Sequence, residues 1–137
     1  MGIDRYYVNK LTMTKVYNEE REVLFYSSNE INDKLFDEIK ILLNNRKLCR
    51  IEMENAQSDL SMCVFCENGI FHVGIVDMYN DVNYYYNNGS GKTELKDIDG
   101  EVFEERMVGT DNNLLWHIIQ EFAHKGNLSE KVEWIKY

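Results

Sequence analysis

The spacing of apolar residues changes along the chain, and each change predicts a different secondary structure. Between residues 31 and 43 apolar side chains recur every three or four positions, which places them on one face of a helix. Ser27 followed three residues later by Glu30 resembles a helix-capping box, so we expect a helix over residues 30–44. From Cys49 to Glu54 apolar and charged residues alternate, which is typical of a strand with one face buried.

Turn residues divide much of the remaining chain into short strands. The stretches 6–16 and 22–26 are rich in strand-forming residues and predict a first hairpin. Asn68-Gly69 supplies the positive φ angles that a type I′ turn needs, and it separates the apolar stretches 61–66 and 70–76. With a further strand expected at residues 81–86, these segments predict an antiparallel meander.

The last third of the chain predicts a second helix between two strands. Thr110-Asp111 supplies an N-cap, the residues that follow carry an apolar face, and Gly126 can close the helix in the left-handed conformation. Strands are expected before and after this helix, at residues 102–108 and 132–137, whereas residues 94–100 look acidic and turn-like.

These elements predict an α+β fold in which an antiparallel, meander-like curved sheet carries two α-helices packed mainly on one face. A chain of 137 residues can build one adequate hydrophobic core, so we expect a single domain over residues 1–137.

The charge balance narrows the choice of partners. The chain has 24 Asp and Glu against 15 Lys and Arg, a formal net charge of -9 that is spread along its length. This charge repels phosphate backbones and anionic lipid and attracts basic partners, so neither a nucleic acid nor a membrane is expected to bind. No apolar run approaches the roughly 20 residues of a membrane helix. The first residues do not resemble a signal peptide, and three cysteines in apolar surroundings suit reduced thiols, so we expect a cytoplasmic location.

Each motif that could carry chemistry has the wrong spacing. Residues 89–93 resemble the end of a phosphate-binding loop, but the first glycine of that motif would fall at Tyr86. Residues 97–100 resemble part of a calcium loop that lacks the acidic residue closing it. Cys63 and Cys66 lie three apart on an expected strand and would therefore point to opposite faces. We expect no catalytic residue, no metal and no cofactor.

The order of parts in the C-terminal half resembles a known family. A hairpin around Asn68-Gly69 is followed by a tyrosine-rich strand, a strand at residues 100–103, an amphipathic helix, Lys125-Gly126 and, five residues later, Val132-Glu133-Trp134. This order is similar to that of immunity protein family 1 of bacterial polymorphic toxin and contact-dependent inhibition systems. The resemblance implies a small cytosolic protein that binds and neutralises a cognate toxin domain, often a nuclease or a deaminase, without catalysis of its own.

On this interpretation, exposed tyrosine and carboxylate side chains would cover a basic site of the toxin. The predicted partner-binding residues are Asp77, Tyr79, Asp81, Tyr84, Tyr86, Glu101 and Glu104. The alternative is a small enzyme or ligand-binding domain with a pocket between sheet and helices that contains His72 and nearby carboxylates. An exposed strand edge would also allow a homodimer.

Overall fold

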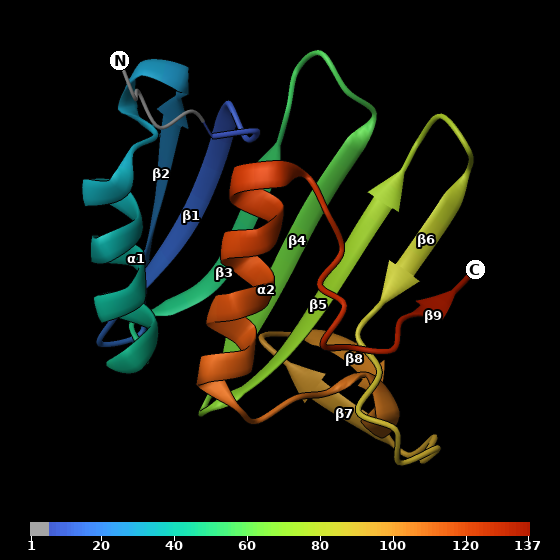
Figure 1. The fold of residues 1–137 in the computed structure, drawn as a ribbon. Coiled ribbons are helices and arrows are strands. Elements are labelled where there is room, and N and C mark those ends of the chain that lie inside the picture. Colours follow the sequence, from blue (N-terminus) through green and yellow to red (C-terminus); the bar gives the residue numbers. More distant parts are fainter. Residues whose placement is uncertain (1–5) are drawn as a thin grey trace.

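A curved antiparallel sheet forms the body of residues 6–137, the part of the chain that the computed structural model describes (Figure 1). Within that range the sheet has seven strands, in the spatial order β2-β1-β3-β4-β5-β6-β9, and every neighbouring pair is antiparallel. Its strands are β1 (Lys10–Tyr17), β2 (Glu20–Ser27), β3 (Leu48–Glu54), β4 (Leu60–Glu67), β5 (Ile70–Asp77), β6 (Val82–Tyr85) and β9 (Ile135–Lys136).

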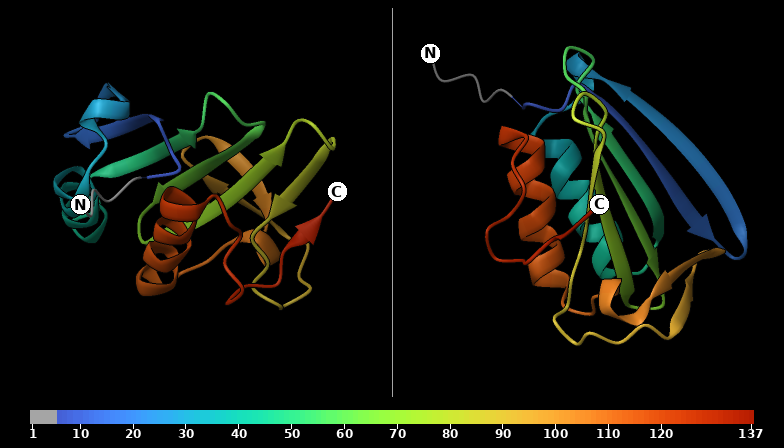
Figure 2. Two further views of the ribbon diagram at one scale, coloured as in Figure 1. Left: turned by 45° about the horizontal axis from the view of Figure 1, so that its top comes forward. Right: turned by 90° about the vertical axis from the view of Figure 1, so that its right-hand side faces the viewer.

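Two helices, α1 (Asp33–Asn44) and α2 (Asn112–Lys125), lie side by side on one face of this sheet (Figure 2). The apolar side chains of this helix face meet those of the sheet in one buried cluster, in which Phe36 and Ile39 of α1 and Phe122 of α2 are almost fully covered. The expected α+β class, with an antiparallel meander and both helices on one face, is therefore confirmed.

The helix ends follow their capping residues. The Ser27–Glu30 capping box exists, but it closes a single 3-10 turn (Ser28–Glu30), and α1 starts three residues later than predicted. The start is set by Asn32, whose side chain accepts a hydrogen bond from the backbone of Leu35 at 3.0 Å. The prediction for α2 is confirmed, since Asp111 caps its start and Gly126, at φ 69°, follows its last residue.

Residues 94–100 are not the irregular turn that the sequence suggested. Strand β7 (Leu95–Ile98) pairs with β8 (Glu101–Glu104) in a separate hairpin, and residues 105–107 form a 3-10 turn. The strand expected over residues 102–108 is therefore shorter and does not extend the meander. Asp99 and Gly100 both adopt positive φ, so they form the tight turn that pairs these two short segments with each other.

The β7–β8 hairpin packs on the sheet face opposite the helices, which we call the open face (Figure 2). Phe103 of β8 stacks on His72 of β5 with ring centroids 4.1 Å apart, and it also contacts Phe65 at 5.3 Å. The hairpin covers this face near the β4–β5 turn, where the backbone of Asp99 donates to Glu67 at 3.0 Å.

Candidate functional site

The turn between β5 and β6 presents large apolar side chains to solvent, and we call residues 77–81 the β5–β6 tip. Met78 is 71% exposed and Tyr79 is 82% exposed, with Asp77 and Asp81 on either side. The Asp77 carboxylate accepts hydrogen bonds from the side chain of Asn80 at 2.8 Å and from its backbone at 3.0 Å. These bonds lower the pKa of Asp77, the side-chain bond contributing most. The tip is thus a turn fixed by hydrogen bonds, with an ionised carboxylate at its base.

A backbone hydrogen bond also joins the tip to the loop before β4. The backbone N–H of Met78 donates to the carbonyl of Asp59 at 3.0 Å, and Asp81 adopts a left-handed conformation at φ 53°. Three of the predicted partner-binding residues, Asp77, Tyr79 and Asp81, are therefore brought together here on a fixed backbone. Met78 was not among the predicted partner-binding residues, although a large apolar residue in a Gly-free polar turn after a strand indicates an exposed contact.

Two other predicted partner-binding residues face the hydrophobic core instead of solvent. Tyr86 is buried, with its ring against Phe71 at 5.0 Å, and Tyr84 is half-buried against the core. Tyr84 lies opposite Ile75 in the register and so shares its inward face, which the alternation of the strand alone did not fix. Tyr85 occupies the open face instead and contacts His72 at 5.7 Å.

The two glutamates of the prediction lie far from the tip. Glu101 and Glu104 belong to β8, beside the β4–β5 turn, which is at the opposite end of β5 from Asp77 (Figure 1). Glu104 is paired with Arg106 at 2.8 Å, and Glu101 lies 3.9 Å from Arg50. The seven residues therefore do not form one surface, and only the tip group remains a coherent candidate.

His72 is buried on the open face of the sheet. Its Nδ1 lies 2.8 Å from the carbonyl of Met107, and its ring packs among Phe65, Tyr85 and Phe103. Burial lowers the pKa of His72 to about 4, so the ring is neutral and, with Nδ1 protonated, donates to that carbonyl. The expected pocket between sheet and helices that contains His72 is thus wrong, because this side chain points to the open face and is sealed by the β7–β8 hairpin.

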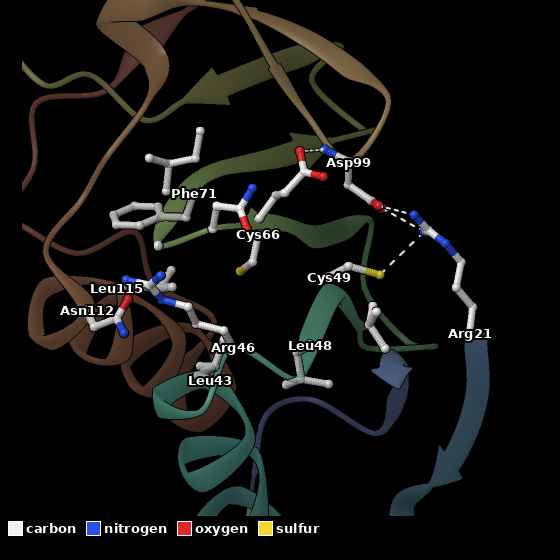
Figure 3. Close-up of a pocket in the computed structure, with 15 residues that line it drawn as sticks. Arg21, Leu43, Arg46, Leu48, Cys49, Cys66, Phe71, Asp99, Asn112 and Leu115 are labelled. Atoms are coloured by element: carbon white, nitrogen blue, oxygen red, sulfur yellow. Dashed lines mark hydrogen bonds and ion pairs between the residues drawn. The ribbon is translucent and has the colours of Figure 1, made fainter. Parts of the chain in front are cut away.

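A cavity of about 190 Å³ does exist at the end of the sheet, where several turns meet (Figure 3). Arg21 from β2 reaches across to Asp99 in the β7–β8 turn and binds its carboxylate with two nitrogens, one at 3.0 Å. Arg46 lies over the β4–β5 turn, so close that a Cβ at Gly69 would stand 2.9 Å from its guanidinium. The first turn of α2 closes the inner side.

Asp99 and the two thiols at this end cavity keep their usual protonation states at neutral pH. Hydrogen bonding from Arg21 holds the pKa of Asp99 below its usual range, so the carboxylate stays ionised. Burial raises the pKa of the Cys66 thiol to about 12 and raises that of Cys49 as well. Neither thiol is therefore activated as a nucleophile. No sequence pattern linked Arg21 to Asp99, which are 78 residues apart.

The two cysteines of β4 point to opposite faces of the sheet, as their spacing predicted. Cys63 and Cys66 lie on β4 with free thiols, Cys66 against the helix-side core. Across residues 6–137 no group of three or more His, Cys, Asp or Glu side chains gathers as a metal site. None of the helices in the same residues is long and apolar enough to cross a membrane.

Comparison with known proteins establishes the class of fold. The chain matches no protein-family model and no curated protein sequence. It superposes on a solved structure described as the crystal structure of a hypothetical protein from Neisseria gonorrhoeae, with a TM-score of 0.63. The superposition covers 95% of each chain at 15% sequence identity, so this likeness concerns the fold alone.

Proposed function

We propose that this protein is a cytoplasmic immunity protein, which binds a cognate toxin domain, a nuclease or a deaminase, and neutralises it by stoichiometric occlusion of its basic site. The observation that carries the proposal is the β5–β6 tip, where Met78 and Tyr79 stand exposed on a hydrogen-bonded turn. The resemblance of the C-terminal half to immunity protein family 1 supplies the class.

The tip has the properties of an interface anchor. Tyrosine gives a large contact area with few rotatable bonds, and anchors of this kind contribute much of the binding free energy in protein complexes. Because Asp77 and Asn80 fix the backbone before binding, less conformational entropy is lost when a partner orders the turn. Exposed Met78 adds an adaptable apolar contact.

The charge supports a basic partner. Asp77 and Asp81 flank the anchor, and the whole chain carries a net charge of -9. An enzyme that handles nucleic acid needs a basic cleft, and the field of an acidic protein speeds its approach to such a cleft. By contrast, two residues on which the family resemblance depends have structural roles. Gly126 closes α2, and the indole N–H of Trp134 donates to the carbonyl of Ser129 at 3.0 Å.

The direct test is co-expression with the toxin domain encoded immediately upstream of this gene, scored by growth and by pull-down of a one-to-one complex. Tyr79→Ala should weaken binding at least about tenfold, as expected for an anchor residue. Asp81→Asn removes one charge yet tolerates the left-handed φ, and it should slow association a few-fold, most at low salt.

Two matched variants serve as controls at sites away from the tip. Tyr17→Ala removes an exposed tyrosine from the other end of the sheet, and Asp37→Asn removes an exposed carboxylate from α1. Both should bind and protect within about twofold of the unmodified protein. If the unmodified protein neither binds nor protects against the upstream domain, the proposed function is wrong; if Tyr17→Ala and Tyr79→Ala weaken binding equally, the tip is not the interface.

A further inference from the structure

Strand β2 leaves its outer side without a neighbouring strand in residues 6–137, although it is eight residues long. The β1–β2 turn determines which residues of β2 hydrogen-bond to β1 and which face outward. Asn18 and Glu19 both have positive φ and form a two-residue loop in this turn. The pair that closes such a loop is hydrogen-bonded, so residues 20, 22, 24 and 26 bond to β1. Arg21, Val23 and Phe25 therefore direct their backbone N–H and C=O groups outward.

This edge lacks two of the features that usually prevent strand pairing, a short length and a proline, and its charged residues 20–22 all lie at one end. The opposite edge of the sheet ends in β9, which has only two residues, whereas β2 has no proline and pairs with β1 in an unbroken register. Val23 is 50% exposed and Phe25 is 74% exposed, both on the open face. The run Val23-Leu24-Phe25-Tyr26 thus combines free main-chain groups with apolar side chains, the composition that favours strand addition.

We propose that β2 pairs antiparallel with β2 of a second copy of this chain, about a two-fold axis at Leu24. The axis must pass through a residue position, because only then do side chains of the same face stand opposite each other. At Leu24 it places Val23 opposite Phe25 of the second copy, and Phe25 opposite Val23. Leu24 meets its own equivalent on the helix face.

The alternative axes match less well. An axis at Val23 sets Leu24 against Glu22 of the second copy, and an axis at Phe25 sets Val23 against Ser27. With the axis at Leu24, the charged residues Glu22 and Arg21 face Tyr26 and Ser27, so no two like charges stand directly opposite. The same segment is therefore complementary to itself, which is what a two-fold interface requires.

The net charge of the chain opposes this contact, and the opposition depends on the salt concentration. Each copy carries a net charge of -9, so the two copies repel at long range, while the contact itself is apolar and main-chain. Salt screens the repulsion but leaves the contact, so the dimer should become tighter between about 0.02 and 0.3 M salt. The β5–β6 tip belongs to another part of the sheet, so the dimer would leave two tips free.

Sedimentation velocity of the full chain at tens of micromolar measures the assembly. The unmodified protein should sediment at about twice the 16.3 kDa mass of one chain. Val23→Lys combined with Phe25→Lys places like charges opposite each other twice and should raise the dissociation constant at least about tenfold. This double variant lowers the net negative charge, so its effect could not come from overall repulsion. Met78→Lys combined with Tyr79→Lys has the same charge change at the tip and should remain dimeric.

The register has its own test. Leu24→Cys brings two thiols together across the axis and should give a disulfide-linked dimer under mild oxidation. Val23→Cys should not, because its equivalents are offset by two residues, about 8 Å apart, which exceeds the roughly 7 Å reach of a disulfide. The unmodified chain, with its native cysteines, provides the background.

Three results would overturn the proposal: a monomeric unmodified protein, a dimer unaffected by Val23→Lys with Phe25→Lys, or cross-linking through Val23→Cys in preference to Leu24→Cys. Circular dichroism of each variant separates loss of pairing from loss of folding. Binding to the toxin domain by the Val23→Lys, Phe25→Lys chain is measured separately, so failure of the dimer and failure of the proposed function are distinguishable.

Discussion

Gly109 lies where the chain enters α2, and its replacement by alanine tests how closely the segments of the core approach each other. Gly109 and Phe71 form a bridge of two backbone hydrogen bonds, at 2.9 and 2.8 Å. A Cβ built on Gly109 would lie 2.2 Å from Cζ of Phe71 and 2.6 and 2.7 Å from the adjacent ring carbons. The ring of Phe71 is itself buried and packs against Tyr86, so it has little room to withdraw.

The expected cost follows from these distances. Non-bonded carbon atoms pack at about 3.5–4.0 Å, so the ring or the backbone must shift by more than about 1 Å. Overpacking of a core usually costs about 1–3 kcal/mol, and the shift also strains two hydrogen bonds. We therefore expect Gly109→Ala to lower the free energy of unfolding by about 3 kcal/mol. At an unfolding entropy of about 2.1 cal/mol/K per residue, this corresponds to a decrease in Tm of about 10 °C.

Gly74→Ala is the matched control for urea denaturation and thermal melting. A Cβ on Gly74 would lie 3.5 Å from the nearest ring carbon of Tyr85, an ordinary contact, and this glycine has no positive φ. Its free energy of unfolding should change by less than about 1 kcal/mol. Phe71→Leu in the Gly109→Ala background should recover part of the loss, giving a favourable coupling energy. Equal stability of Gly109→Ala and Gly74→Ala would refute the reasoning.

Three further changes probe the buried histidine and two turns. The free energy of unfolding should fall by about 2 kcal/mol from pH 7 to pH 5, because burial lowers the pKa of His72 to about 4 and only the unfolded chain binds this proton in that range. Guanidinium unfolding at several pH values should show a weaker dependence of this free energy on pH for His72→Phe. An equal dependence in both proteins would contradict the argument. Asp99→Asn should cost about 1–2 kcal/mol at pH 7 through its lost ion pair with Arg21, which is partly solvent-screened. Because that hydrogen bond lowers the pKa of Asp99, the difference should vanish as the pH falls through the lowered pKa; a constant difference down to pH 2 would exclude this origin. Gly126→Ala should cost about 1–3 kcal/mol in thermal melts, since it has φ 69° and its Cβ would stand 2.8 Å from the ring of Tyr7, and an unchanged Tm would count against this close approach.

Local signals predicted the elements that depend on neighbours in the sequence. The caps of α2 and the Asn68-Gly69 turn were identified correctly, because a cap or a two-residue turn is made by the residues that it contains. The start of α1 was misplaced because two capping residues, Ser27 and Asn32, compete within six positions. The first closes only a 3-10 turn.

The predicted site was only partly assembled. Asp77, Tyr79 and Asp81 lie together because they share one turn, which the sequence could indicate. Tyr84 and Tyr86 were assigned to the wrong face, since the alternation of a strand gives its period but not its phase. The phase is fixed by pairing with β5, where Ile75 stands opposite Tyr84.

The sequence by itself determined the class of fold, the positions of most strands, the second helix and a strongly acidic surface, because periodicity, turn chemistry and charge are properties of neighbouring residues. Only the tertiary structure decided that β7 and β8 pair apart from the meander, that Arg21 meets Asp99, and that His72 is sealed as a neutral ring. These features join residues 35 or 78 positions apart or depend on the register of one strand against another. Such contacts form only when the whole sheet and its helices pack together.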